Sequence, residues 1–153
     1  MFPSVWPSAF AYFGLAIVSA VLPWVNAELL MISAVPLAAS RSALAALVIA
    51  VAAGQMTGKT LMYWASRRSV HPRSPLVQRG IDRWRLRLQR RPQSAVAIIF
   101  LSALVGVPPF FIVSVAAGAL GVAFPRFLVA GAVGRLAHFT IVAFVPDILW
   151  RTS

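Results

Sequence analysis

The chain has 153 residues, of which 60% are hydrophobic and only 11% are charged, with a mean hydropathy of +0.84. Soluble domains are about half apolar and a quarter charged, so this composition excludes an ordinary soluble domain and indicates an integral membrane protein. The net charge of +11 does not indicate nucleic-acid binding, because nine of the fourteen basic residues fall between Arg67 and Arg91, in the one long polar stretch.

The N-terminal part of the chain is apolar and carries no basic residue before Arg41. A cleaved signal peptide begins with a basic region, so we expect this part to remain on the mature chain. Two apolar stretches, Ser8 to Leu22 and Ala27 to Ala39, flank Pro23. At 1.5 Å per helical residue each reaches about 20 to 23 Å, short of the roughly 30 Å hydrocarbon core. This favours a re-entrant helical hairpin broken at Pro23; the alternative is a kinked span joined to a short connecting helix.

Glu28 lies in the second of these arms and is the one acidic residue set within an apolar stretch. A carboxylate in hydrocarbon costs roughly 3 kcal/mol on insertion scales, so such a group is retained mostly where it faces protein, water or a substrate. With Asn26 beside it, we expect Glu28 to lie just past the break and to carry a proton or a cation. The alternative is a structural carboxylate that pairs with an arginine or caps freed backbone amides.

Residues Ser42 to Tyr63 form the first stretch that is long enough to cross a bilayer. Gly54 and Gly58 lie four residues apart within it, a spacing that lets another backbone approach closely, so we assign them to helix packing. Lys59 follows, about a turn from the expected cytoplasmic end. Its ammonium either snorkels to the interface or contacts a substrate.

The polar stretch 67–93 is predicted to be a basic cytoplasmic loop that contains an amphipathic helix lying on an anionic leaflet. Its apolar residues recur at steps of four, three and four, which places them on one helical face opposite four arginines. The apolar face is Val77, Ile81, Trp84 and Leu88, and the basic face is Arg79, Arg83, Arg87 and Arg90.

The second half repeats the layout of the first. The short stretches Ser94 to Val107 and Phe110 to Leu120 flank Pro108 and Pro109, and a full span follows from Phe127 to Val145. With a hairpin and one span in each half, 8–66 and 94–147, the second half is inverted relative to the first. We therefore predict one all-α membrane domain over 1–153, with two hairpins whose tips meet near the midplane, as in transporters built from inverted repeats.

The second span contains Gly131 and Gly134, which favour helix packing, followed by Arg135 and His138. An arginine this deep needs a partner, and Glu28 or a phosphate is the natural anion. We expect the charged groups of Glu28 and Arg135 to lie within about 8 Å or to share a polar cavity, because either charge alone in hydrocarbon is costly. His138 is a further candidate for this site.

Together these residues resemble the DedA superfamily, also called SNARE-associated or VTT-domain proteins, and are closest to its short YqaA-like branch. The resemblance runs from about Val18 to Phe144. Its motifs are Asn26-Ala27-Glu28-Leu29-Leu30, Ala53-Gly54-Gln55-Met56-Thr57-Gly58-Lys59, Tyr63-Trp64-Ala65-Ser66-Arg67, Val107-Pro108-Pro109, Ala116-Ala117-Gly118 and Gly134-Arg135.

The resemblance implies two facing re-entrant helices and a role in lipid translocation, with polyprenyl phosphate or phospholipid as the substrate. Glu28 matches the family's acidic residue in the first re-entrant segment, Arg135 matches the arginine of the last motif, and Gly118 joins the packing glycines. The chain departs from the family at Lys59, where many members have an acidic residue, and at His138, often an arginine. It also lacks arginines between Arg91 and Arg126, where transporting members carry them.

Three classes of function remain open. Lipid translocation, with protons or cations as coupling ions, is the first; a small proton-coupled cation or drug antiporter is the second; a non-transporting assembly factor is the third. We expect neither an enzyme nor a cofactor, because the sequence has no cysteine and no recognisable catalytic or phosphate-binding motif. Thirteen arginines to one lysine suggest a GC-rich bacterial genome and hence the cytoplasmic membrane, and the faces at Gly54 and Gly58 suggest a homodimer.

Overall fold

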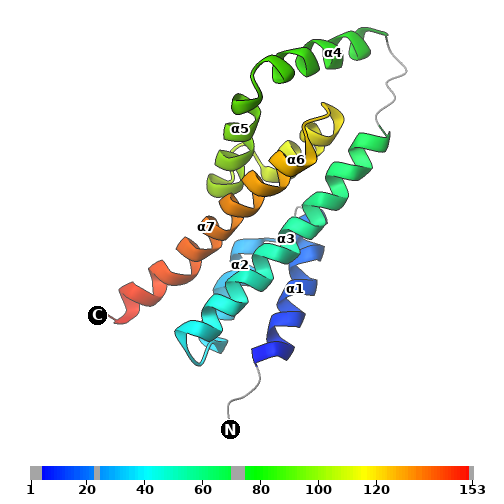
Figure 1. Cartoon of the computed structure of the whole chain (residues 1–153). Helices are drawn as coiled ribbons and strands as arrows, with labels where there is room; N and C mark the ends of the chain where they lie inside the picture. Colours follow the sequence, from blue (N-terminus) through cyan, green and yellow to red (C-terminus); the bar gives the residue numbers. More distant parts are fainter. Residues whose placement is uncertain (1–4, 23–24, 70–74, 152–153) are drawn as a thin grey trace. The chain divides into compact units, whose positions relative to one another are not determined.

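The computed structural model describes residues 5–22, 25–69 and 75–151, and this part of the chain is helical, without a strand (Figure 1). The predicted all-α class is confirmed. In chain order the elements are α1 (Val5–Val21), α2 (Ala27–Ala34), the 3₁₀ turn η1 (Val35–Leu37), α3 (Arg41–Ser69), α4 (Pro75–Arg90), α5 (Pro92–Val105), α6 (Phe110–Ala119) and α7 (Phe124–Arg151).

Among the described residues, two helices are long and apolar enough to cross a membrane. They are α3, with 29 residues, and the part of α7 from Phe124 to Val145, with 22. These helices contain the two predicted spans, Ser42 to Tyr63 and Phe127 to Val145. At 1.5 Å per residue, α3 extends for about 44 Å and so exceeds the hydrocarbon core of roughly 30 Å. Its last turn carries Arg67 and Arg68, which suit the interface beyond the core.

The four predicted short arms are also helices: α1, α2 with η1, α5 and α6. The first predicted break, Pro23, lies outside the described residues. At the second break, α5 is followed by Gly106 with a φ of +82°, a left-handed conformation that glycine adopts without a Cβ penalty. A cis Val107–Pro108 bond follows, and α6 begins after Pro109. Re-entry of these arms into a membrane and the inverted repeat stay predictions.

The chain divides into two compact units. Unit 1 comprises Met1–Gly58 and Arg135–Ser153, and unit 2 comprises Lys59–Gly134. Unit 1 therefore takes α1, α2, the first part of α3 and the last part of α7, while unit 2 takes the remainder of both long helices together with α4, α5 and α6. The boundaries differ from the sequence halves 8–66 and 94–147, because each long helix contributes to both units.

Unit 1 is held together by small residues that let α1 approach α3 closely. A methyl group at Gly54 would meet the carbonyl oxygen of Phe13 and lie 2.8 Å from the Cβ of Ala16. A methyl group at Gly58 would meet the Cβ of Ala20. The prediction that these glycines form the face of a homodimer is therefore wrong about the face, because α1 of the same chain already covers it. A homodimer through another face stays a prediction.

Unit 2 is centred on aromatic side chains. The ring of Tyr63 on α3 stacks on that of Phe127 on α7, with centroids 4.8 Å apart, and Phe127 stacks in turn on Phe110 of α6. All three side chains are buried. The Tyr63 hydroxyl donates a hydrogen bond to the carbonyl of Val122 and accepts one from Arg67. These contacts fix the turn between α6 and α7 against the end of α3.

Two of the remaining packing glycines also mark close helix approaches in unit 2. A methyl group at Gly118 would meet the carbonyl oxygen of Tyr63 and the hydroxyl of Ser66, and one at Gly134 would lie 2.8 Å from the carbonyl oxygen of Phe100. Gly131 is buried. Here α6 packs on α3, and α7 packs on α5, at backbone distance.

Helix α4 is amphipathic, but its faces differ in detail from the prediction. Ile81 and Leu88 are partly buried, whereas Trp84 is 55% exposed; the side chain of Val77 is not described. Arg85 takes a place on the packed side, where it donates a hydrogen bond of 2.8 Å to the carbonyl of Ala119 at the end of α6. A cation at a helix C-terminus is favoured by the helix dipole.

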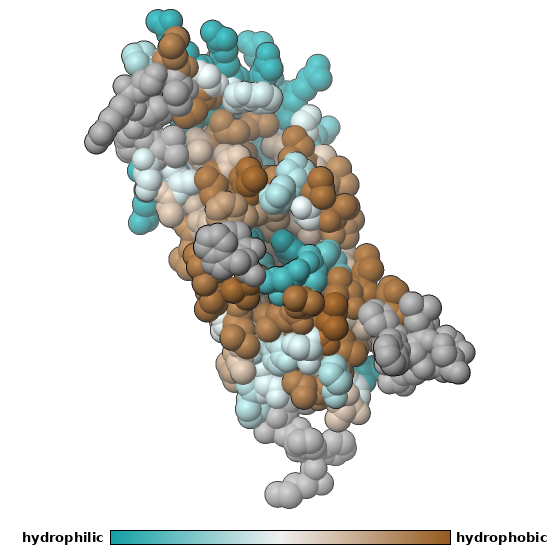
Figure 2. Space-filling view, turned by 180° about the vertical axis from the view of Figure 1, so that it is seen from behind, coloured by the Kyte–Doolittle hydropathy of each residue, from teal (hydrophilic) through white to brown (hydrophobic). Residues whose placement is uncertain are grey.

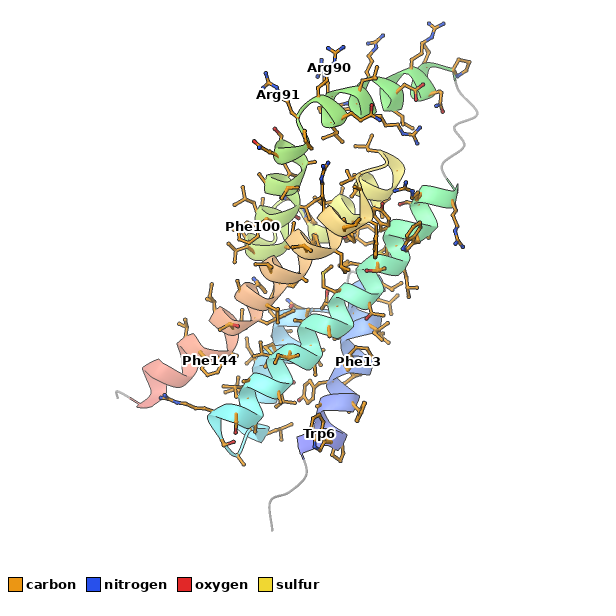
Figure 3. All side chains as sticks on the ribbon, viewed as in Figure 1. Trp6, Phe13, Arg90, Arg91, Phe100 and Phe144 are labelled. Atoms are coloured by element: carbon orange, nitrogen blue, oxygen red, sulfur yellow. The ribbon has the colours of Figure 1, made fainter. Side chains whose placement is uncertain are left out.

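The four arginines of the predicted basic face, at positions 79, 83, 87 and 90, are exposed. Arg90 and the following Arg91 project away from the helices (Figure 3). Hydrophilic side chains gather at this end of unit 2, whereas the surface beside it is hydrophobic (Figure 2). The predicted basic face is therefore present as an exposed cationic surface on α4.

Candidate functional site

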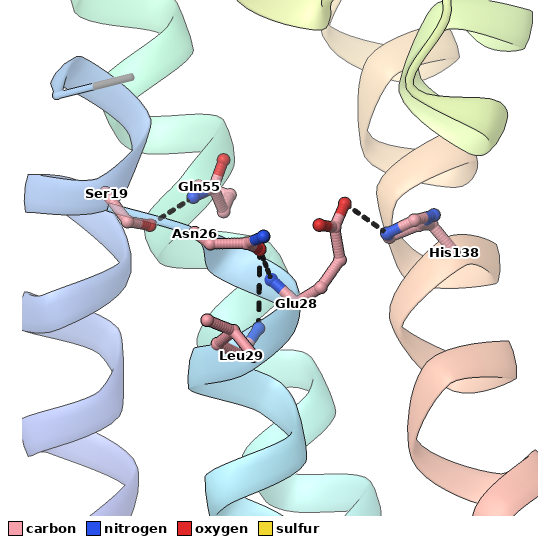
Figure 4. A network of polar contacts seen from close by, with 6 residues as sticks. All are labelled: Ser19, Asn26, Glu28, Leu29, Gln55 and His138. Carbon is pink, nitrogen blue, oxygen red and sulfur yellow. Dashed lines mark hydrogen bonds and ion pairs between the residues drawn. The ribbon is translucent and has the colours of Figure 1, made fainter. Parts of the chain in front are cut away.

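The site in unit 1 is built on the N-terminus of α2. Asn26 is the N-cap residue, and its side-chain oxygen accepts hydrogen bonds from the backbone N–H groups of Glu28, at 2.8 Å, and Leu29, at 3.3 Å (Figure 4). An asparagine cap satisfies amides that a helix start leaves without partners. Because Asn26 supplies the cap, the carboxylate of Glu28 is not needed for that role and its side chain reaches away from α2.

The carboxylate of Glu28 meets His138 on α7. Glu28 Oε1 lies 3.4 Å from His138 Nε2, and the two side chains converge from their separate helices (Figure 4). The side chain of His138 is 13% exposed, whereas that of Glu28 is 46% exposed. The pair is therefore enclosed on the histidine side and accessible from the surface on the glutamate side.

Arg135 joins this pair from one turn earlier on α7. Its spacing of three residues from His138 places both side chains on the same helical face. Arg135 is 8% exposed and interacts electrostatically with Glu28, and its guanidinium lies 5.6 Å from the centre of the Phe139 ring. Glu28 therefore makes its direct contact with His138, and the predicted short distance between the charged groups of Glu28 and Arg135 stays a prediction.

Gln55 is a buried polar residue that the sequence analysis did not single out. Its side-chain amide donates to the hydroxyl of Ser19 and, at 3.3 Å, to the carbonyl of Ala16, both on α1 (Figure 4). Ser19 itself donates to the same carbonyl at 3.0 Å. The signal available in the sequence was an uncharged polar residue within the apolar span of α3, next to Gly54.

Lys59, the fifth predicted substrate- or ion-binding residue, belongs to unit 2. Its side chain is buried, and its ammonium lies 5.6 Å from the centre of the Phe111 ring on α6. Of the five residues predicted to bind substrate or ions, four therefore form a connected set in unit 1: Asn26, Glu28, Arg135 and His138. Lys59 has its own surroundings in unit 2.

The connected set combines a carboxylate, an imidazole and a guanidinium within an apolar chain. A carboxylate beside an imidazole can pass or hold a proton, since histidine is the side chain that changes charge most readily near neutral pH. A guanidinium can bind a phosphate or carboxylate. The three side chains together are therefore suited to proton and anion chemistry.

The helices and this polar cluster define a helical protein with candidate membrane spans. Comparison with family models gives the more specific assignment, because the VTT domain matches residues 22–147. The match covers most of the chain, so the protein belongs to the VTT-domain family, the DedA or SNARE-associated family, as the sequence motifs predicted. The family is membrane-associated and linked to transport. No curated protein and no solved structure matched the chain.

Proposed function

We propose that this protein moves lipids between the leaflets of the bacterial cytoplasmic membrane as a multi-pass, non-enzymatic transporter. The observation that supports the proposal best is the cluster of Glu28, His138 and Arg135 in unit 1. The substrate class is a phospholipid or a polyprenyl phosphate, whose polar headgroup must cross an apolar region that excludes charge.

The physical argument concerns the cost of moving a phosphate through hydrocarbon. An ionised group at the bilayer centre is expensive unless it has a partner, and a guanidinium is a suitable partner for phosphate. Arg135 supplies that charge, and its interaction with Glu28 lowers the cost of burying the guanidinium when no headgroup is bound. An entering phosphate would replace the Glu28 carboxylate as the partner of Arg135. The carboxylate would then keep His138 as its partner.

Exposure of Glu28 on one side of the cluster supports this exchange. Its side chain is 46% exposed while Arg135 is 8% exposed, so the carboxylate lies at the open side of the cluster, where it can move away from the guanidinium as a headgroup enters. Two helix arms on either side of a break, α5 and α6, are consistent with a broken-helix transporter.

A proton-coupled cation or drug antiporter is the second candidate. The observation that favours it is the Glu28–His138 pair itself, because a carboxylate that exchanges a proton for a cation is the minimal equipment for antiport. The two functions differ in what crosses the membrane: the antiporter takes up a cation when a pH gradient is imposed and moves no lipid.

The test is headgroup-resolved lipid transport by the purified full chain in liposomes. Labelled phospholipid or polyprenyl phosphate starts in one leaflet, and its appearance in the other is followed over time. We expect transport by the native chain and loss with Glu28→Gln, while Arg79→Ala on the exposed face of α4 retains it. A folded protein that moves no lipid would contradict the proposal; cation uptake in the same liposomes under a pH gradient would then identify the antiporter, and no flux of either kind an assembly factor.

A further inference from the structure

Unit 2 contains a basic hollow that is separate from the cluster around Glu28. It has a volume of about 190 Å³ and lies among the end of α4, the start of α5 and the turn between α6 and α7. Its polar lining comes from Arg85, Gln89 and Arg126. The turn is shaped by Gly121, whose φ of +72° is left-handed.

The charge of the hollow is positive. Arg85 is partly committed, since it donates to the carbonyl of Ala119 and lies 3.7 Å from the carboxylate of Asp82. Arg126 is exposed, and within the described part of the chain its side chain makes no hydrogen bond or ion pair. The hollow is therefore lined by two arginines, of which Arg85 is the one near a carboxylate.

Two apolar grooves meet the hollow. The first shares Leu88 and Leu120 with it and continues past Trp84, Ile98 and Val113, with a volume of about 140 Å³. The second shares Arg126 with it and continues between α5 and α7, with a volume of about 520 Å³. Its apolar lining includes Val96, Phe100, Val129 and Val133.

A cationic hollow that opens into two apolar grooves has the chemistry of an anionic headgroup with two acyl chains. We propose that it binds one anionic diacyl phospholipid, held as a resident lipid at the basic end of unit 2. Arg126 contacts the phosphate, Arg85 and Gln89 line the remainder of the headgroup site, and one chain lies in each groove.

Charge and shape together select this occupant. The helix α4 carries exposed arginines beside the hollow, and basic amphipathic helices lie on leaflets rich in anionic lipid. A soluble phosphate or nucleic acid would use the arginines and leave both grooves empty. A zwitterionic lipid would fill the grooves and carry a second, positive group into a site that already holds two arginines.

The experiment measures binding by the full-length chain, delipidated in a neutral detergent. The probes are phosphatidylglycerol, phosphatidylcholine with the same chains, lysophosphatidylglycerol and glycerol phosphate. We expect phosphatidylglycerol to bind about tenfold more tightly than phosphatidylcholine, a difference of about 1.4 kcal/mol. Arg126→Gln should remove this preference, whereas Arg83→Gln, the same charge change on the exposed side of α4, should keep it.

A groove variant tests the acyl chains. Val133→Trp fills the second groove and should weaken binding of phosphatidylglycerol to the level of lysophosphatidylglycerol. Val145→Trp, at an exposed valine of α7 outside the groove, should not. Equal binding of the two diacyl lipids, equal losses with Arg126→Gln and Arg83→Gln, no effect of Val133→Trp, or competition by glycerol phosphate as strong as that by phosphatidylglycerol would overturn the inference.

This inference does not depend on the proposed transport. We expect Glu28→Gln to slow lipid movement yet to bind phosphatidylglycerol with the native preference. A chain that transports lipid but shows no such preference contradicts the resident lipid alone. A chain that shows the preference but moves no lipid contradicts the transport alone.

Discussion

Glu28 Oε1 and His138 Nε2 lie 3.4 Å apart, although the two residues come from opposite ends of the chain. This contact joins the start of α2 to the later part of α7 within unit 1. It also gives the Glu28 carboxylate a side-chain partner. The backbone amides at the start of α2 already donate to Asn26, so the carboxylate is not needed to cap them. The polar group that the sequence isolates is therefore part of a tertiary contact.

The first prediction concerns coupling between these two residues in transport. Glu28→Gln and His138→Gln should each slow lipid movement, because each leaves the other polar group without its partner. The double variant should be about as slow as the slower single variant, with a coupling of about 0.5 to 3 kcal/mol between the sites. The measurement is the initial rate of labelled-lipid movement in liposomes, divided by the amount of inserted protein. Comparing the native chain, the two single variants and the double variant gives the coupling between the two residues. Simply additive effects would show that the residues act separately.

The second prediction concerns the close contact of α1 with α3. Gly54→Ala places a methyl group against the Phe13 carbonyl and Ala16, and should lower the free energy of unfolding by about 1 to 3 kcal/mol, as overpacking does. Gly14→Ala is the matched control in α1, since its methyl group would meet nothing within 4 Å. That variant should gain up to about 1 kcal/mol from helix propensity. Unfolding in detergent measures both, and equal effects would contradict the packing assigned to Gly54.

The third prediction concerns the hydroxyl of Tyr63. Tyr63→Phe keeps the stack on Phe127 but leaves the Val122 carbonyl without that donor. The cost should be about 0.5 to 1.5 kcal/mol of unfolding free energy, as for one lost hydrogen bond, because Arg67 still donates to the same carbonyl at 3.3 Å. Tyr12→Phe, which removes an exposed hydroxyl contact with Ser33 at 3.1 Å, should cost less. If the two substitutions cost the same, the buried contacts of Tyr63 do not hold the α6–α7 turn.

The fourth prediction concerns topology. We expect 67–91 to face the cytoplasm and both Met1 and Ser153 to lie outside, because two hairpins add no net crossing and two spans add two. The chain has no cysteine, so Arg79→Cys gives a single labelling site on α4. An impermeant thiol reagent should label it only after the cell is opened, and reporter fusions at the C-terminus should report an outside location. Labelling of Arg79→Cys in intact cells would show that α4 lies outside and would contradict the predicted orientation.

The sequence by itself determined the helical elements and the character of the site. Length and hydropathy indicated the regions of α3 and α7 that can span a membrane, and the prolines and short apolar runs indicated the four shorter helices. The motifs around Glu28 and Arg135 predicted the family. These features are readable because helix length, apolarity and breaks depend on local residues, and because a lone carboxylate in an apolar run is conspicuous on its own.

Only the tertiary structure decided which helix each face meets. A spacing of three or four residues shows that Arg135 and His138 share a face, but it does not select the side chain that makes the direct contact with Glu28, which is His138. The same spacing at Gly54 and Gly58 predicts close approach, yet it cannot tell α1 of the same chain from a second copy. In the sequence, Arg85 is one of nine basic residues in the polar stretch and has no distinguishing feature. The structure distinguishes it, because its side chain donates a hydrogen bond to the carbonyl of Ala119 at the end of α6. Such pairings are contacts between residues far apart in the chain. The periodicity of a helix reports which residues share a face, but it does not identify the helix that this face contacts.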